Sequence, residues 1–215
     1  MGALEGSLSF KTYYVKGEPP NDFQETYLRK LQEHFFEPLS PVGDVERSVG
    51  WVPAQDPIAT EFSRDHLFFN QYIVFAMRID KWALPSCWVK ALMRQAVAAH
   101  IAEAGLKETG DEKRPAKLSK SAKDKIKLEV VTRIKQQILP AMKVIDVCWN
   151  IQENKLRFWS QSNAVCDEFA ELFESTFGLQ LAPDSPFLMA RELGLSESQL
   201  DAMVNADPWH PVFDH

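Results

Sequence analysis

The chain has 215 residues, of which 45% are hydrophobic and 25% are charged, and its formal net charge is −6. This composition is that of an ordinary globular protein, long enough for one sizeable domain or two small ones. No apolar run approaches the roughly 18 residues that a membrane span needs, and the opening MGALEGSLSFKTYYVKGE lacks the pattern of a secretory leader. We therefore expect a cytoplasmic protein that makes no use of a membrane.

The first third of the chain shows strand and helix patterns in turn. Alternating aromatic and β-branched residues predict a strand over 7–15, which ends before a turn rich in glycine and proline. Asn21 or Asp22 is placed to cap a helix that continues to about Phe36. Further strands are predicted at 49–53 and 66–79, the second as a pair of strands or a hairpin around Asn70 and Gln71.

Two helices are predicted next, separated by a polar connector. After Pro85, the stretch SCWVKALMRQAVAAHIAEAG has the length and alanine content of a buried helix that ends at Gly105. The second helix begins near Ser119 or Ser121, and Ser121 with Asp124 has the spacing of a capping box.

The second helix carries an apolar stripe that becomes charged toward its beginning. The apolar positions are Val130, Ile134 and Ile138, and nearly the same stripe contains Lys120, Lys123 and Lys127. Lysines are almost never buried without a partner. We therefore expect this helix to begin outside the domain and to run into it, so that the two helices form a projecting basic helical arm.

Positive charge is concentrated around this helix. Lys107 to Lys135 contains ten basic and five acidic residues, a net charge of +5, whereas the remaining residues contain 14 basic and 25 acidic, a net charge of −11. One basic surface on an otherwise acidic protein is the usual electrostatic footprint of nucleic-acid binding.

The last third predicts a hairpin followed by helices. KVIDVCWNIQENKLRFWS (143–160) has two strand patterns with a turn at Glu153 and Asn154. Ser162 is placed to cap an amphipathic helix that ends at Gly178, and two short helices follow, one from Ser185 and Pro186 and one from a capping box of Ser196 and Gln199.

This order of elements does not alternate as βαβ units do. We expect an α+β fold with an antiparallel sheet, divided into an N-terminal part of the sheet (1–84), the helical arm (85–139) and a hairpin with C-terminal helices (140–215), all parts of one continuous fold. Three widely spaced cysteines among apolar neighbours indicate reduced core thiols rather than disulfides or a metal site: Cys87, Cys148 and Cys166.

Several of these segments together resemble the bacterial recombination-associated protein RdgC family. They are GWVP (50–53), the Pro85 helix with WVKALM, KLSKSAKDKIKLEV (117–130) followed by ILP (138–140), and the hairpin IDVCWNIQENKLRF with its amphipathic helix. The resemblance implies a non-enzymatic, largely sequence-independent protein that closes as a dimeric ring around duplex DNA and restrains recombinase filaments. Family members have a longer C-terminal half, so the chain resembles a shortened member.

The candidate DNA contacts are the basic residues of the arm, because each phosphate that they neutralise releases condensed counterions without regard to sequence. They are Arg114, Lys117, Lys120, Lys123 and Lys127, with Lys143 just after ILP. The alternative is a solvated helix face. The position of the lysines on a stripe that is apolar further along favours DNA contact, as does the resemblance.

Tryptophans could also stack on bases, but most lie in apolar segments and are expected in the core: Trp51, Trp88, Trp149 and Trp159. Trp82 and Trp209 are the two that we expect to be free for contacts.

Two rival functions remain open from the sequence. Asp146, Glu153 and Lys155 are the residue types that a metal-dependent nuclease uses to hold Mg²⁺ and orient water, although Glu153 falls in the expected turn. The other rival is a protein-interaction module that has lost DNA binding. We expect no catalytic residue, metal or cofactor, and as partners duplex DNA and a second copy of the chain in the nucleoid, with antagonism of a recombinase.

Overall fold

The computed structural model describes residues 2–3, 9–103 and 118–206, which form an α+β fold as expected. These residues contain seven helices and one antiparallel sheet with the strand order β2-β4-β5-β6-β1-β7, and β3 pairs with β4. The chain divides into two compact units, which are residues 1–35, 51–77 and 145–215 in the first and residues 36–50 and 78–144 in the second. The boundaries cut through β2 (Arg47–Val52), β4 (Tyr72–Lys81) and β5 (Ala141–Asn150), so these strands contribute to both units.

Strand pairing in the first unit centres on the predicted hairpin. β5 pairs with β6 (Lys155–Phe158) across a turn in which Asn154 has a positive φ of 49°, which an asparagine adopts more easily than most residues. β6 pairs with β1 (Lys11–Lys16), and β1 pairs with β7 (Gln180–Pro183), a strand that the sequence did not predict. Its backbone pairing along β1 makes the four residues of β7 a strand, although their own pattern is too short to indicate one.

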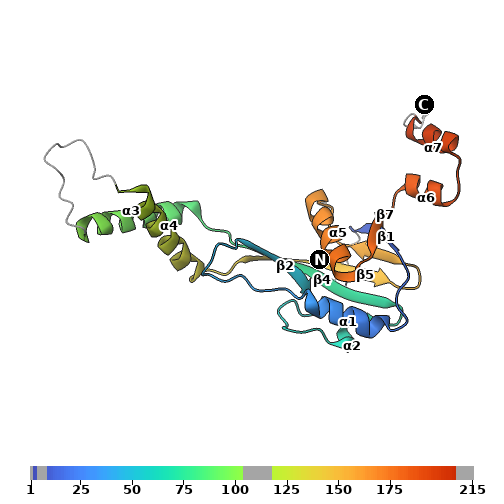
Figure 1. Ribbon diagram of the computed structural model, residues 1–215, viewed down its shortest axis with the longest axis horizontal. Coiled ribbons are helices and arrows are strands. Elements are labelled where there is room, and N and C mark those ends of the chain that lie inside the picture. Colours follow the sequence, from blue (N-terminus) through green and yellow to red (C-terminus); the bar gives the residue numbers. More distant parts are fainter. Residues whose placement is uncertain (1, 4–8, 104–117, 207–215) are drawn as a thin grey trace, which may run out of the picture. The chain divides into compact units, whose positions relative to one another are not determined.

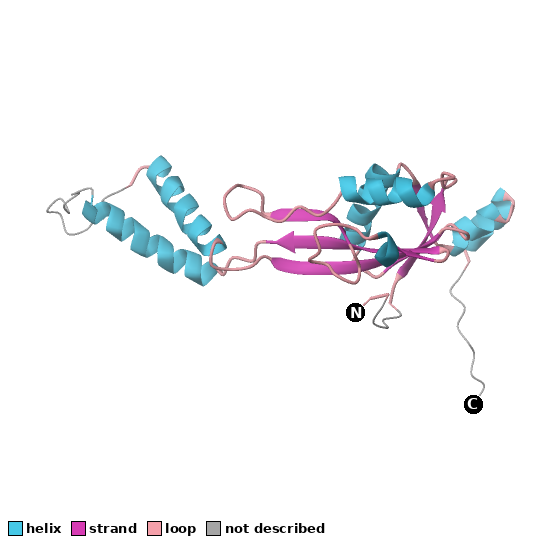
Figure 2. Cartoon of the chain, turned by 90° about the horizontal axis from the view of Figure 1, so that it is seen from below, coloured by secondary structure: helices cyan, strands magenta, loops and turns pink. Residues whose placement is uncertain are grey.

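α1 (Phe23–Glu33) and α5 (Asn163–Phe177) cover one face of these strands (Figure 2). The Phe169 ring of α5 stacks on Phe158 of β6 with the ring centroids 4.0 Å apart, and the Tyr27 ring of α1 stacks on Trp149 of β5 at 5.1 Å. The aromatic side chains at this contact are almost entirely inaccessible to solvent, which places the core of the first unit between the two helices and the sheet.

The remaining elements of the first unit are short. α2 (Arg64–Leu67) leads into β3 (Phe68–Phe69), which forms a tight hairpin with β4 through Asn70, a residue with a φ of 54°. α6 (Pro186–Glu192) and α7 (Glu197–Val204) lie at the C-terminal end, and the predicted capping box of Ser196 and Gln199 is present. Ser162 is the N-cap residue of α5 as predicted, although its side chain makes no capping hydrogen bond, and Gly178 ends α5 in the left-handed conformation as expected.

The second unit contains α3 (Ser86–Glu103) and α4 (Lys120–Lys135), which lie side by side (Figure 1). α3 was expected to be a buried helix, but none of its residues is buried, because it packs against α4 along one face only. Ser119, not Ser121, caps α4, and its hydroxyl accepts a hydrogen bond from the backbone N–H of Ala122 at 3.2 Å. The expected end of α3 at Gly105 lies outside the described residues.

Candidate nucleic-acid interface

α3 and α4 form a helical hairpin, called the α3–α4 hairpin below, with a small apolar core of its own. Ile126, Val130 and Ile134 of α4 are buried against partly buried side chains, most of them on α3: Leu84, Val89, Leu92, Met93, Ala96, Val97, Leu118 and Ile138. Ile126 was not part of the predicted stripe, and Ile138 lies beyond the end of the helix. The apolar face of α4 is therefore used to hold α3, which leaves the rest of its surface to solvent.

Four lysines on the first two turns of α4 are exposed: Lys120, Lys123, Lys125 and Lys127. None of them makes an ion pair or a side-chain hydrogen bond with a described residue. Lys123 lies one heptad before the buried Val130, on the same stripe, yet it is exposed. Figure 2 shows the reason, because the two helices diverge toward the ends that flank residues 104–117.

The structure brings three of the six predicted contacts together, namely Lys120, Lys123 and Lys127 on α4. Lys143 is exposed but lies on β5, outside the hairpin. Arg114 and Lys117 fall outside the described residues.

Four further exposed basic residues in the described part of the hairpin were not predicted as contacts from the sequence, and one of them is Arg133 in the last turn of α4. Lys125 belongs to the basic stretch but lies off the apolar stripe, and it is exposed. Lys90 and Arg94 are exposed one turn apart on α3. Their spacing of four residues is the signal that could have identified them as neighbours on one face of a helix.

Lys135, at the end of α4, behaves differently from the other lysines. Its side chain is only 4% exposed, its ammonium donates a hydrogen bond to the Gly43 carbonyl at 3.3 Å, and it lies 5.7 Å from the centroid of the Trp82 ring. Trp82 is buried by this contact, which corrects the expectation that it is free. Trp88, which was expected in the core, is 64% exposed.

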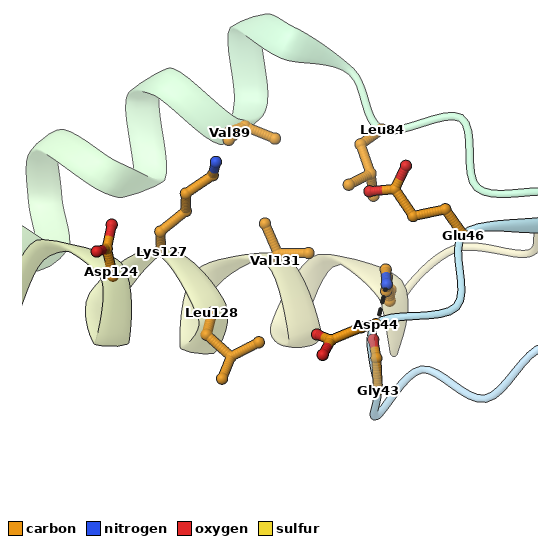
Figure 3. A pocket seen from close by; sticks show the side chains of 10 residues that line it. Gly43, Asp44, Glu46, Leu84, Val89, Asp124, Lys127, Leu128 and Val131 are labelled. Atoms are coloured by element: carbon orange, nitrogen blue, oxygen red, sulfur yellow. Dashed lines mark hydrogen bonds between the residues drawn. The ribbon is translucent and has the colours of Figure 1, made fainter. Parts of the chain in front are cut away.

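A cavity of about 470 Å³ lies beside α4 in the same unit (Figure 3). Apolar and charged side chains line it together: Leu84, Val89, Leu128, Val131, Asp44, Glu46, Asp124, Lys127 and Lys135. Figure 3 shows Lys127 directed from α4 toward Val89 of α3. Three carboxylates against two ammonium groups make the lining mixed in charge, so the cavity adds nothing to a phosphate-binding surface.

The two units differ sharply in charge. The second unit has 16 basic and ten acidic residues, a net charge of +6, whereas the first has eight basic and 20 acidic, a net charge of −12. The positive charge noticed in the sequence therefore belongs to a structural unit and not only to a stretch of chain. The exposed lysines of α4 lie on that unit.

The nuclease trio does not come together. Lys155 pairs with Asn150 at the turn end of the β5–β6 hairpin. Asn150 is four residues from Asp146 along β5, so the backbone positions of Asp146 and Lys155 are roughly 13 Å apart along the strand direction. One carboxylate oxygen of Asp146 accepts the backbone N–H of Ala3 at 2.6 Å, and a Cβ atom on Gly2 would collide with that same oxygen. Among the described residues, no group of three or more histidines, cysteines and carboxylates is arranged to hold a metal ion.

The cysteines are partly as expected. Cys166 is buried and Cys148 half-buried, but Cys87 is exposed on α3. Burial raises the pKa of the Cys148 thiol, a shift that Arg157 opposes and Asp146 increases. A raised pKa keeps this thiol protonated at neutral pH and therefore a poor nucleophile.

Comparison with known proteins adds no family assignment. No protein-family model matches the chain, and no curated protein matches it significantly. Within the described residues, no helix is both long and apolar enough to cross a membrane.

Proposed function

We propose that this protein binds duplex DNA, largely without regard to sequence, through the exposed basic residues of the α3–α4 hairpin. The observation that carries the proposal is the group of four exposed lysines on the first two turns of α4, which pair with no described residue and lie in a unit with a net charge of +6. Lysine ammonium groups contact phosphates as point charges, and contacts to phosphates carry no sequence information, so such a surface favours affinity over sequence preference.

The opposite net charges of the two units have different consequences for duplex binding. The hairpin supplies counterion release, which gives most of the affinity in sequence-independent binding. The net charge of −12 on the first unit opposes broad adsorption of that unit to a duplex, so the hairpin is the contact that we expect for duplex DNA.

The biological setting of the proposal comes from the resemblance to the RdgC family. On that basis we propose that the protein acts as a homodimer on nucleoid DNA in the cytoplasm, and that it modulates recombination by occupying DNA that a recombinase would otherwise use. No catalytic step is part of this function.

The first experiment is fluorescence anisotropy with two unrelated 30-base-pair duplexes over a series of salt concentrations. Wild type is compared with a variant in which Lys120, Lys123 and Lys127 are all replaced by Ala. We expect wild-type affinity in the micromolar range or tighter at low salt, equal for both duplexes. The variant should bind both more weakly, and the slope of log K against log salt should fall by about 0.9 for each phosphate that the protein no longer neutralises.

A matched control variant removes three positive charges from the acidic unit, at Lys11, Arg29 and Arg191, which are not part of the hairpin. It should bind with the same salt slope as wild type. An unchanged slope in the α4 variant would reject the hairpin as the contact. Absence of binding by wild type at low salt would reject the DNA function and favour a protein-interaction module.

A further inference from the structure

The face of β1 and β6 that points away from α5 has an unusual composition. On the opposite face, Tyr13 contacts Phe169 of α5, and Leu156 and Phe158 are fully buried. Side chains alternate across a strand, so the neighbouring positions point away from this core. We call the surface that they form the β1–β6 face, and it consists of Thr12, Tyr14, Lys16, Lys155 and Arg157, together with Phe10 and Trp159 just beyond the strands, whose ring centroids lie 5.2 Å apart.

Basic and aromatic side chains lie next to each other on the β1–β6 face. The strand register sets Tyr14 opposite Lys155 and Thr12 opposite Arg157. The Lys155 ammonium lies 5.4 Å from the centroid of the Tyr14 ring, and the Arg157 guanidinium carbon lies 5.5 Å from that of Phe10. Both aromatic rings and both cations are half-buried, so the rings line the sheet surface and do not fill a core.

Among the described residues, the cations of this face have no carboxylate partner. Neither Lys155 nor Arg157 makes an ion pair with a described residue. On the adjoining strand β5, the carboxylate that points to the same side is Asp146, which already accepts the N–H of Ala3. Although the first unit has a net charge of −12, three of its eight basic residues lie on this face, at Lys16, Lys155 and Arg157.

We propose that the β1–β6 face binds single-stranded nucleic acid, with bases on the rings of Tyr14 and Phe10 and phosphates against Lys155, Arg157 and Lys16. Stacking of a base on an aromatic ring is stronger than a cation–π contact at an exposed site, so bases displace the two cations, which then meet the phosphates. Rings that lie level with a sheet are reached by unstacked bases, whereas a duplex keeps its bases inside. This site is separate from the α3–α4 hairpin and does not depend on the function proposed for it.

The test is fluorescence anisotropy with labelled 15-nucleotide oligo(dT), and in parallel with oligo(U), across a salt series. In the first variant Lys155→Gln and Arg157→Gln are combined. We expect this variant to lose about tenfold in affinity and about 1.4 in the salt slope, which corresponds to two phosphate contacts on a single strand. A second variant, Tyr14→Leu, keeps the charge and should lose about five- to tenfold with an unchanged salt slope, because only stacking is removed.

The control variant is Lys11→Gln, which removes a charge from the same strand on the opposite side, where Lys11 bonds to Asn163. It should bind oligo(dT) as wild type does, and so should the α4 triple-lysine variant. Thermal unfolding of each variant confirms that it is folded. Wild-type affinity in both folded test variants would overturn the proposal, as would failure of wild type to bind either strand at low salt. The tighter-binding probe then identifies the strand as DNA or RNA.

Discussion

Two buried aromatic residues in the core of the first unit differ in whether their polar atoms find a hydrogen-bond partner. The indole N–H of Trp51 donates to the Thr176 hydroxyl at 2.8 Å, so this tryptophan is satisfied inside the core. The Tyr27 hydroxyl is equally inaccessible but has no hydrogen-bond partner among the described residues. An unsatisfied buried hydroxyl costs stability, and replacement of the tyrosine by phenylalanine removes that cost while it keeps the ring in place.

Tyr27→Phe tests this difference through the pH dependence of stability. Burial raises the pKa of Tyr27 from 10 to about 12, so from about pH 10 upward the unfolded chain loses this proton before the folded protein does. The contribution of Tyr27 to stability is therefore complete below pH 10 and declines as the pH rises toward 12. Burial also raises the pKa of Tyr13, which acts in the same direction.

We expect Tyr27→Phe to leave the free energy of unfolding at pH 7 unchanged or to raise it by up to about 1 kcal/mol. Between pH 10 and 12 the variant should lose less stability than wild type, as measured by urea unfolding at each pH. A substantial loss at pH 7 would show that the hydroxyl has a partner, such as a bound water.

Asp146 is a second residue whose role can be tested directly. Because its carboxylate holds the backbone of Ala3, we expect Asp146→Ala to cost about 1 kcal/mol in unfolding free energy and to leave duplex binding unchanged. Incubation of labelled DNA with 5 mM Mg²⁺ should yield no cleavage by either protein. Cleavage by wild type that Asp146→Ala abolishes would establish the nuclease instead.

At the scale of the element, α4 has two roles along its length. Its first two turns present lysines to solvent, and its later turns hold α3 through Val130 and Ile134. A local reading of the helix anticipated this division, because the charged and apolar positions follow each other on one stripe. It could not anticipate that Lys135 is buried, because Gly43 and Trp82, which surround it, come from distant parts of the sequence.

Ile134→Ala tests whether the hairpin depends on its small core. Ile134 is 5% exposed, so we expect a loss of about 2–3 kcal/mol, seen as an earlier loss of helical circular dichroism in urea. Leu128→Ala is the matched control, since Leu128 lies on the same helix but is 55% exposed, and it should cost less than about 0.5 kcal/mol. Equal losses in the two variants would mean that another surface covers Leu128.

At the scale of the whole molecule, the two units differ in the size of their cores. The first unit contains fully buried Trp51, Trp149 and Phe158, whereas the hairpin core consists of three buried residues and partly exposed neighbours. Local opening is easier where few apolar contacts are buried. The hairpin is therefore the part of the described chain that we expect to open first.

Hydrogen exchange followed by mass spectrometry checks this expectation. Amides in α3 and α4 should exchange at least tenfold faster than those in β6 and α5. Addition of saturating duplex DNA should slow exchange in α4 if the hairpin is the contact, and should leave α5 unchanged. If the amides of α4 in the free protein were protected from exchange as strongly as those of β6, the expectation that the α3–α4 hairpin opens first would be wrong.

The sequence by itself determined the elements whose signals are local. The β5–β6 hairpin, the end of α5 at Gly178, the capping box of α7 and the α+β class follow from turn residues, capping residues and periodicity within a few positions of each other. The concentration of positive charge in one stretch was equally readable, because formal charge does not depend on the fold.

Only the tertiary structure decided which faces these elements bury and what they bring together. β7 exists because β1 pairs with it, Trp82 is buried while Trp88 is exposed, and Asp146 is separated from Lys155 by strand register. The β1–β6 face combines residues near position 12 with residues near position 156. The physical reason is the same in each case: burial and register depend on partners far away in the chain, and local periodicity contains no information about them.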